Sequence, residues 1–441
     1  MVLNYRKKAR MVFLDISKRF DHVWHEGLLY KLRQLGIEWP LLNLIQSYLY
    51  NRLQCVTTGS QTSPMLPVEA GVPQGSILGP LLFLVFINDI TDGISCDIKL
   101  FADDTSILEI VYDPTISGSR VNADLGRIFV WGKEWKVTFN ATKSLALLFS
   151  AKHNKPYHPP LFLGETMIPE GINHTHLGIT LSNNLKWNAH IIRIIDKARK
   201  RLTLFFRLKY KLSRNTLVRL YKAMVRPILE YGCVIFDNCT IDLAKSLESV
   251  QYEAARICLG ALKRTPRHLL LNELGWPTLA TRRKYFKLIL FYKMVNRLTP
   301  AYLSDLVPFD VQPTVNVRNR RSLRQIKFTS SRFGNSFLPS AIKLWNDLPD
   351  DIRQSTSLAQ FKSKLKSTLL STDPVPGHYS HGKRFPNIIH TQLRLDFCRL
   401  NSHLHRFNII PSAACNCSHP NESTYHFFWN VLSFPTIEYP Y

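Results

Sequence analysis

The chain has 441 residues and carries 57 Lys and Arg against 32 Asp and Glu, which gives a formal charge of +25. Hydrophobic residues account for 45% of it, so it can bury a sizeable core and is not generally disordered. Its longest apolar stretch, Ile77 to Ile87, is too short to cross a bilayer. The positive excess therefore indicates a polyanionic partner, and nucleic acid fits better than a membrane.

The eight cysteines are too few and too scattered for a disulfide framework in a chain of this length. The N-terminus has basic residues but lacks the apolar region and cleavage site of a signal peptide. Both features predict a reducing, intracellular location.

The first part of the chain, to about Leu108, has the pattern of a mixed α/β region. Gly and Pro residues separate its apolar segments, and helical spacing alternates with short apolar runs. In chain order we expect a strand at 11–15, helices at 25–35 and 41–49, a helix from Pro80 to about Ile90, a strand–turn–strand at 99–108, a loop at 113–120, a helix through 125–131, and strands at 137–139 and 145–149.

The second part is predicted to be helical and basic. Residues 191–226 hold twelve Lys and Arg and one acid, Asp196. Pro227 should end or kink the helix there. The apolar stripe expected along this helix is Leu217, Leu220, Tyr221, Met224, Val225 and Ile228. Further on we expect helices over 241–297, a linker at 311–327, short helices at 340–348 and 358–369, a Pro-, Gly- and Ser-rich separator at 371–380, and a last module at 385–441.

Three aspartates stand where rigid backbone could bring their carboxylates together. Asp15 ends the first apolar strand, and Asp103 and Asp104 form the turn of the later strand–turn–strand segment. If the two strands lie side by side, the carboxylates converge and offer the oxygen ligands that a pair of divalent cations needs for phosphoryl transfer. The simpler alternative is that Asp15 caps a helix and the Asp pair merely forms a turn.

Neighbouring segments set these aspartates in a wider pattern. The chain contains, in this order, FLDISKRFD at 13–21, GVPQGSILGP at 71–80 and FADD at 101–104. Together they resemble motifs A, B and C of the reverse transcriptases of non-LTR (LINE-type) retrotransposons, the Jockey-like group especially. NATK at 140–143 resembles motif D, and the segments at 176–190, 226–232 and 336–349 also look typical of these elements.

The resemblance implies an α+β fold at the front: a right-hand polymerase palm, built as an antiparallel sheet flanked by helices. A helical thumb and a mostly helical C-terminal extension would follow. On this basis the domains expected are a palm with partial fingers (1–187), the thumb (188–300), a basic linker and helical connector (301–372) and a Cys/His-containing C-terminal module (373–441).

The same resemblance implies an RNA-directed DNA polymerase. Its partners would be an RNA template, a DNA primer and deoxynucleoside triphosphates, in a nuclear or cytoplasmic ribonucleoprotein. Asp15 and Asp103 would be the principal ligands of two Mg²⁺ ions, with Asp104 a third carboxylate close by. Lys143 of motif D would act near the pyrophosphate as a general acid or charge stabiliser, or it is simply a solvated lysine.

Two further motifs would shape the nucleotide site. Phe20 matches the steric gate that leaves no room for a ribose 2′-OH; the alternative is that Phe20 belongs to the core. In the Gly71–Pro80 loop, the glycines allow close backbone approach to a ligand, and Gly79 and Pro80 would start the following helix. Gln74 and Gly75 would contact the nascent base pair and the template.

The basic helices resemble a thumb that grips the template–primer backbone without reading sequence. Arg219, Lys222 and Arg226 lie largely off the apolar stripe and are the residues expected to do so. The basic cluster of the linker would act similarly or form a flexible tail; it consists of Arg318, Arg320, Arg321, Arg324 and Lys327.

The sequence departs from the family pattern near its start. It begins about ten residues before motif A, so we expect the upstream fingers strands and an endonuclease to be missing and apolar palm surface to be exposed. Arg19 stands where the family normally has a small residue. A guanidinium there would crowd the nucleotide pocket or pair with a catalytic aspartate, and either outcome lowers activity.

A third departure lies near the C-terminus. Cys415, Cys417 and His426 resemble the family's CCHC-like cluster, but the expected fourth ligand falls at Val431. Tetrahedral Zn²⁺ needs four donors, so three give at best an open, weak site. The residues that could substitute are Cys398, His403, His405 and His419.

Two functions follow from the sequence. The first is RNA-directed DNA polymerisation by a partial copy, for which we expect poor activity of the isolated chain. The second is a catalytically inactive nucleic-acid-binding remnant, in accord with the charge excess and the three departures.

Overall fold

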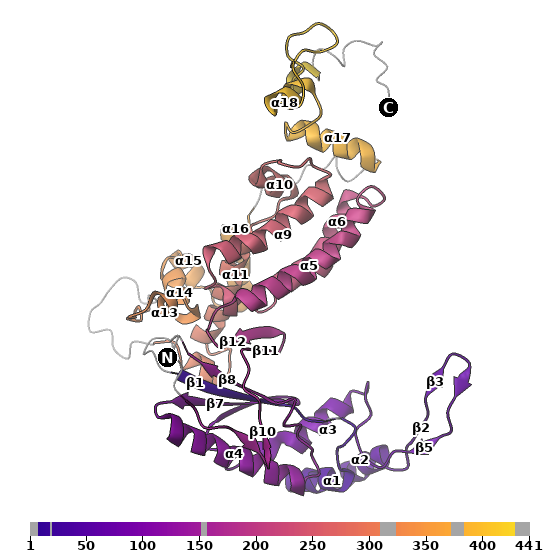
Figure 1. Ribbon diagram of the computed structural model, residues 1–441, viewed down its shortest axis with the longest axis vertical. Helices are drawn as coiled ribbons and strands as arrows, with labels where there is room; N and C mark the ends of the chain where they lie inside the picture. Colours follow the sequence, from indigo (N-terminus) through magenta and orange to yellow (C-terminus); the bar gives the residue numbers. More distant parts are fainter. Residues whose placement is uncertain (1–7, 18–19, 151–156, 309–322, 372–382, 428–441) are drawn as a thin grey trace. The chain divides into compact units, whose positions relative to one another are not determined.

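The computed structural model describes residues 8–17, 20–150, 157–308, 323–371 and 383–427 (Figure 1). The chain divides into two compact units, Met1–Ala189 and His190–Tyr441. In the described ranges, no helix combines the length and apolar character needed to cross a membrane. The finer domain boundaries expected within the second unit stay predictions.

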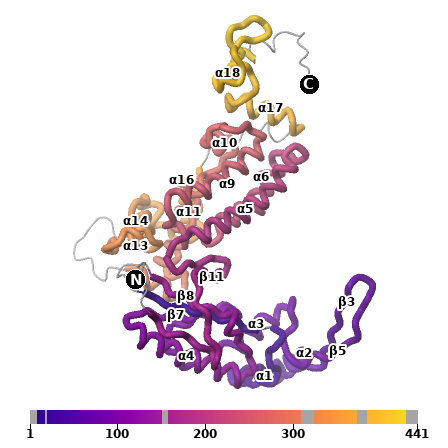
Figure 2. The backbone as a smooth tube through the Cα atoms, viewed as in Figure 1, coloured from indigo at the N-terminus to yellow at the C-terminus, as the bar shows by residue number. Residues whose placement is uncertain are grey.

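The first unit is built from one four-stranded sheet, several helices and short two-stranded hairpins (Figure 2). Its elements are β1 (Lys8–Leu14), α1 (His25–Gln34), α2 (Leu41–Leu49), β2 (Leu53–Gln54), β3 (Thr57–Thr58), β4 (Gln61–Thr62), β5 (Leu66–Pro67), α3 (Leu78–Ile87), a 3₁₀ turn (Asn88–Thr91), β6 (Asp97–Phe101), β7 (Asp104–Val111), α4 (Pro114–Glu134), β8 (Leu145–Phe149), β9 (Phe162–Leu163), β10 (Thr166–Met167), β11 (Asn173–His176) and β12 (Ile179–Ser182).

The main sheet has the strand order β6-β7-β1-β8, and every neighbouring pair is antiparallel. Because side chains alternate along β1, the strand serves two apolar clusters. Val12 and Leu14 join the large core formed with α1, α3 and α4. Phe13 and Ala9 join a smaller cluster on the opposite face. The predicted strand at 11–15 and the strand–turn–strand at 99–108 are therefore confirmed, with an antiparallel pairing that places β1 beside β7.

The loop expected at 113–120 is wrong, because α4 already begins at Pro114. The Asp113 carboxylate accepts hydrogen bonds from the N–H groups of Thr115 and Ile116 at 2.8 and 2.9 Å. An Asp N-cap followed by Pro at the first helical position is a strong start signal, which the nearby Ser-Gly-Ser sequence obscured. Position 118 of this helix favours glycine, because an added Cβ would come within 3.1 Å of the Pro159 side chain.

Two other boundaries differ from the sequence-based expectation. The helix expected to start at Gly79 and Pro80 begins at Leu78, and the Ser76 hydroxyl accepts a hydrogen bond from the Gly79 N–H at 2.9 Å. Its α-helical part ends at Ile87, before the 3₁₀ turn. The strand expected at 137–139 is reduced to an isolated bridge between Ile16 and Phe139.

The described part of the second unit is helical. Its elements are α5 (Asn188–Leu208), α6 (Arg214–Leu220), a π-helical segment (Tyr221–Val225), α7 (Arg226–Glu230), α8 (Cys233–Phe236), α9 (Ile241–Leu259), α10 (Arg267–Leu274), α11 (Leu279–Val295), α12 (Ala301–Ser304), α13 (Ser331–Gly334), α14 (Phe337–Asn346), α15 (Asp350–Arg353), α16 (Leu358–Leu369), α17 (Arg384–Arg394), α18 (Asn401–Arg406) and α19 (Thr424–His426). Helices α11, α14 and α16 share an apolar core around the buried Trp345. Residues 311–322 of the expected linker and 372–380 of the expected separator lie outside the described residues.

The apolar stripe expected at 217–228 is only partly correct. The buried residues are Leu217, Tyr221, Val225 and Leu229, which recur every four positions. This spacing follows from the π-helical turn over Tyr221–Val225, since the wider turn shifts the buried face by about one residue relative to an α-helix. Pro227 does not end the helix, because α7 continues past it to Glu230.

Exposed leucine side chains gather on two helices of the first unit. They are Leu41 and Leu44 of α2 and Leu78, Leu81 and Leu84 of α3. Each is between 42% and 66% exposed. Several exposed leucines on two helices are more notable than a single surface leucine, which needs no explanation.

Candidate active site

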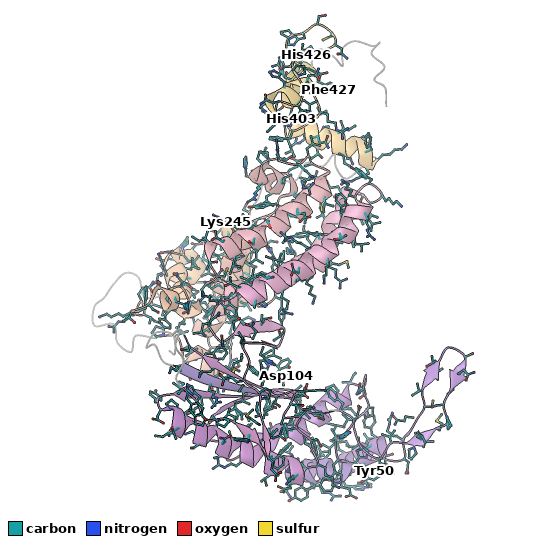
Figure 3. The ribbon with its side chains drawn as sticks, in the orientation of Figure 1. Tyr50, Asp104, Lys245, His403, His426 and Phe427 are labelled. Atoms are coloured by element: carbon teal, nitrogen blue, oxygen red, sulfur yellow. The ribbon has the colours of Figure 1, made fainter. Side chains whose placement is uncertain are left out.

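The sheet brings the predicted carboxylates to one end of two paired strands. The β1–β7 ladder ends with Leu14 opposite Thr105. Asp15 directly follows Leu14 and Asp104 directly precedes Thr105, so the two aspartates continue the ladder from neighbouring strands. Figure 3 labels Asp104 at this end of the sheet.

Asp103 lies in the tight turn that joins β6 to β7, where Phe101 pairs with Asp104. The turn is possible because Ala102 adopts a left-handed backbone conformation, with φ of 52°. Asp15, Asp103 and Asp104 are each partly buried, so their carboxylates remain accessible to a ligand. Asp15 directly follows strand β1 and does not cap a helix, while Asp103 does lie in a turn. The metal-binding role of the three aspartates stays a prediction.

The motif D loop is tied to the backbone of Asp15. The Asn140 N–H donates to the Asp15 carbonyl at 2.8 Å, and the Asp15 N–H donates to the Ser144 hydroxyl at 3.1 Å. The Asn140 side-chain oxygen accepts from the Thr142 N–H at 3.1 Å, which closes an Asx turn, and also from the Lys143 N–H at 3.1 Å. Lys143 is exposed and stands on a loop that is fixed against the first carboxylate.

Two histidines of β11 flank the carboxylates on the face that carries Phe13. The ring of His174 stacks on Phe13 with centroids 4.1 Å apart, and His176 lies 5.0 Å from the same ring. Burial lowers the pKa of both imidazoles, and the negative charge of Asp104 partly opposes this shift. Asp104 therefore has two imidazoles as neighbours in which burial favours the neutral form.

Motifs A and B together line a cavity of about 730 Å³. Phe20 and Gln74 both face it, and the Gln74 side-chain amide donates to the Asp21 carboxylate at 2.8 Å. Gly71 lets the two segments approach, because its φ is +94° and an added Cβ would lie 2.8 Å from the Phe20 carbonyl oxygen. Gly75 also has a positive φ, but an added Cβ there would meet nothing within 4 Å.

Phe20 lies between the core and the cavity, and its role as a steric gate stays a prediction. Its ring lies 5.0 Å from Phe83 and packs against the large core, yet it also forms part of the cavity wall. Arg19, which the sequence marks as a departure, lies outside the described residues.

Comparisons with known proteins agree with this geometry. Residues 2–173 match the family model described as "Reverse transcriptase (RNA-dependent DNA polymerase)". This part of the chain is a reverse transcriptase domain of the non-LTR type. The predicted family is therefore confirmed, as is the coarse fold of helices mixed with antiparallel sheets.

Two curated relatives from Drosophila melanogaster illustrate the similarity. The chain is 30% identical over 266 residues to "Probable RNA-directed DNA polymerase from transposon X-element", covering 58% of this chain and 29% of the relative. It is 31% identical over 260 residues to "RNA-directed DNA polymerase from mobile element jockey", covering 56% and 28%. The chain thus spans less than a third of the length of these relatives.

Among solved structures, the chain is similar to a telomerase from Candida albicans in complex with a fragment of telomeric RNA. The identity is 12%, the TM-score is 0.30, and the match covers 57% of this chain and 46% of the other. A TM-score this low supports no inference about the reverse transcriptase domain.

The basic residues expected to contact nucleic acid form a cluster in the second unit. The side chain of Lys222 reaches the surface. Partial desolvation by its neighbours, and then the charges of Arg226 and Arg282, lower its pKa. Arg226 and Arg282 both lie beside Glu230, which contacts the Arg282 guanidinium directly and Arg226 at 3.9 Å. Arg219 is exposed one turn earlier. One carboxylate thus pairs with two of these cations, and a net positive charge remains.

The structure brings the three C-terminal ligand candidates together. The ligand atoms of Cys415, Cys417 and His426 all lie within 4.8 Å of one another. The Cys417 sulfur is 3.1 Å from Nε2 of His426, and the ring of His419 stacks on that of His426 at 4.0 Å. Two thiols and an imidazole are a donor set suited to Zn²⁺. Val431 lies outside the described residues.

Sequence reasoning missed several residues that build the candidate site. Ser144 and Asp21 act through hydrogen bonds to Asp15 and Gln74, which no spacing rule reveals. His174 had a usable signal: His-Thr-His in a short strand places both imidazoles on one face.

Proposed function

We propose that the chain is an RNA-directed DNA polymerase in which the first unit is the palm and the second unit begins with the thumb. The single observation that carries the proposal is the position of Asp15 and Asp104 at the same end of the paired strands β1 and β7. Strands of a hydrogen-bonded sheet hold such side chains more rigidly than loops would. Asp103, in the tight turn directly before Asp104, would supply a third carboxylate.

The residues at this end of the sheet fit divalent magnesium. Hard cations take oxygen ligands, and three carboxylates from two neighbouring strands supply them. Asp15, Asp103 and Asp104 would hold the ions. When bound, Mg²⁺ would lower the pKa of a primer 3′-OH and balance the charge of the triphosphate and the departing pyrophosphate.

The remaining residues of the site would orient the substrate. Phe20, held by Phe83, would stack under the incoming sugar and exclude a 2′-OH. Gln74, held by Asp21, would contact the nascent base pair, with Gly75 beside the template. The Lys143 ammonium would stabilise negative charge on the pyrophosphate or supply it with a proton.

The basic cluster of Arg219, Lys222 and Arg226 would hold the template–primer backbone. Contacts of this kind supply affinity and position but no sequence information. Partners of this polymerase would be an RNA template, a DNA primer and deoxynucleoside triphosphates.

Primer extension on an RNA template with Mg²⁺ tests the proposal. We expect the chain to extend weakly, and Asp103→Asn to abolish extension. The matched control is Asp97→Asn on the same hairpin, because Asp97 is exposed and pairs only with Lys99 in the described contacts. Extension by Asp103→Asn at the rate of the unchanged chain would contradict the proposal.

The second candidate function is a catalytically inactive nucleic-acid-binding remnant. The net charge of +25 favours it, as does Arg19 in motif A. Filter binding to single-stranded RNA across a salt series should then give a steep slope, since each neutralised phosphate releases counterions. If binding is steep in salt but extension stays absent after Arg19→Ala, the remnant is the better description. A flat salt response would argue against it.

A further inference from the structure

The second unit contains a groove that neither the motifs nor the basic cluster explains. It has a volume of about 690 Å³ and lies between the C-terminal ends of α5 and α9 and the helix α17. Its walls include Phe206 and Tyr210 near the end of α5, Arg256 on α9, and Phe385 and Ile389 on α17. None of Arg219, Lys222 and Arg226 is among its lining residues.

Hydrogen bonds fix the walls of the groove before anything binds. The Arg384 guanidinium donates to the Lys209 carbonyl at 2.9 Å and to the Ile257 carbonyl at 3.0 Å, so one side chain of α17 ties together the ends of α5 and α9. Burial lowers the pKa of Arg384 to about 10, and it still carries its charge at neutral pH. A groove that is already formed costs less ordering entropy when a ligand enters.

A second tie holds α17 against the loop after α9. The Gln392 side-chain amide donates to the Gly260 carbonyl at 2.8 Å. Gly260 has φ of +65°, and an added Cβ would lie 2.5 Å from the Ile388 side chain. The close approach of α17 therefore depends on glycine at this position.

The groove is positively charged. Its lining contains four cationic side chains and, among the described residues, no Asp or Glu. The four are Lys209, Arg256, Lys263 and Arg399. A concave surface with one sign of charge concentrates ligands of the opposite sign, so its occupant should be an anion of several charges.

Exposed aromatic rings stand among these cations. Phe206, Tyr210 and Phe385 are 50%, 62% and 63% exposed. The Lys209 ammonium lies 4.0 Å from the centre of the Phe206 ring and 4.7 Å from that of Tyr210. Aromatic faces interleaved with cations suit a ligand that carries flat rings and phosphates together, which is the chemistry of unpaired nucleotides.

We propose that this groove binds single-stranded RNA, with bases stacked on Phe206, Tyr210 and Phe385 and phosphates beside the four cations. The choice of RNA rests on the proposed function, in which the chain handles an RNA template. A duplex fits poorly, because its bases are already stacked and cannot reach the rings. An apolar peptide would leave the four cations without partners.

The test is fluorescence anisotropy of the full chain with a labelled single-stranded RNA of about eight nucleotides, a length within the range of known single-strand sites. Tyr210→Ala and Phe385→Ala should each weaken binding about tenfold, the usual effect of losing one stacked base. The matched control is Tyr302→Ala on α12, which is equally exposed at 62% but does not line the groove. It should leave the affinity unchanged.

A charge test uses the salt dependence of the same binding. Arg399→Gln should lower the slope of log K against log salt by roughly 0.7, the value for one phosphate contact on a single strand. Lys245→Gln is the control, because Lys245 is an exposed lysine on α9 that does not line the groove (Figure 3). Ultraviolet crosslinking of the unmodified chain to the same RNA should label peptides that contain Phe206, Tyr210 or Phe385.

Several results would overturn the proposal. The first is an equal loss of RNA affinity in Tyr210→Ala and Tyr302→Ala, and the second is crosslinks confined to other peptides. The third is that the RNA duplex, or the DNA strand of the same sequence, binds more tightly than the single-stranded RNA. A dimer of RNA-free protein that Tyr210→Ala dissociates would assign the groove to a second copy instead. Because these measurements need no polymerisation, a chain that binds RNA here but fails in primer extension would contradict only the proposed function.

Discussion

The hydroxyl of Ser144 accepts a hydrogen bond from the backbone N–H of Asp15 at 3.1 Å and donates one to the Asn140 carbonyl at 2.8 Å. Ser144 is only 1% exposed, so water cannot replace either bond. The hydroxyl therefore couples the position of the first predicted metal ligand to the loop that carries Lys143.

Replacing this hydroxyl should affect both stability and activity. We expect Ser144→Ala to lower the free energy of unfolding by about 1–2 kcal/mol, because it removes the hydrogen-bond partner of the partly buried Asp15 N–H. Primer extension should fall by more than this loss of folded protein explains. The control is Ser246→Ala, whose exposed hydroxyl donates to the Asp242 carbonyl at 2.8 Å, and which should cost less than about 0.5 kcal/mol. Urea unfolding would contradict the expectation if both variants behaved alike.

The close approach at Gly71 gives a second prediction. Gly71→Ala adds a methyl group 2.8 Å from the Phe20 carbonyl oxygen and 2.9 Å from Asp21, on top of the strain of a positive φ. Gly59→Ala is a matched control, since its φ is +60° but an added Cβ would meet nothing within 4 Å. Gly59→Ala should cost about 1 kcal/mol from the backbone alone, and Gly71→Ala clearly more. The difference between the urea midpoints of the two variants measures the steric cost of the methyl group at position 71. Equal midpoints would show that the segments around Phe20 and Gly71 can move apart freely.

The sequence was sufficient to predict those elements in which local signals and spacing agree. The β6–β7 hairpin follows from two apolar runs meeting at Asp103 and Asp104, and the resemblance supplied its pairing with the strand that ends at Asp15. Such features depend on neighbours in the chain or on a motif order that a single sequence displays. The position of Asp15 near Asp104 could therefore be expected only with the resemblance added to the order of the residues.

The sequence was insufficient to predict those features in which tertiary contacts override the local pattern. The π-helical turn at Tyr221–Val225 changed the buried face, and its cause is distant: the Tyr221 hydroxyl donates to Gln251 and its ring stacks on Trp276 at 4.3 Å. The groove beside α17 depends on Arg384 reaching carbonyls more than a hundred residues earlier in the chain. No periodicity or motif encodes these partners.

Zinc binding at the C-terminal cluster is the third prediction. Equilibrium dialysis should find one Zn²⁺ held weakly by the chain, because Cys415, Cys417 and His426 supply only three donors. Cys417→Ser and His426→Gln should each abolish it. Cys239→Ser is the control, since this thiol lies outside the cluster. Retention of zinc by both ligand variants would assign the metal to other residues.

The last prediction concerns pH. His190 is 1% exposed at the start of α5, with its ring 5.0 Å from that of Phe236. Burial, and secondarily the charge of Arg193, lowers the pKa of His190 to about 4 from its ordinary value of 6.5. Between these values the unfolded chain binds more protons than the folded one, so the free energy of unfolding should fall as the pH drops from 6.5 toward 4. The contribution of His190 to that fall is about 3 kcal/mol, from 1.36 kcal/mol for each pKa unit.

The measurement is urea unfolding of the unchanged chain and of His190→Gln at several pH values. The variant should lose less stability over this range, and His268→Gln, at an exposed position, should follow the unchanged chain. Burial raises the pKa of Glu248, which makes stability change with pH in the opposite sense. Glu248 is present in all three proteins, so the difference between the curves isolates His190. Parallel curves for His190→Gln and the unchanged chain would mean that the imidazole is protonated within the fold, with a counter-charge or water reaching it between α5 and Phe236.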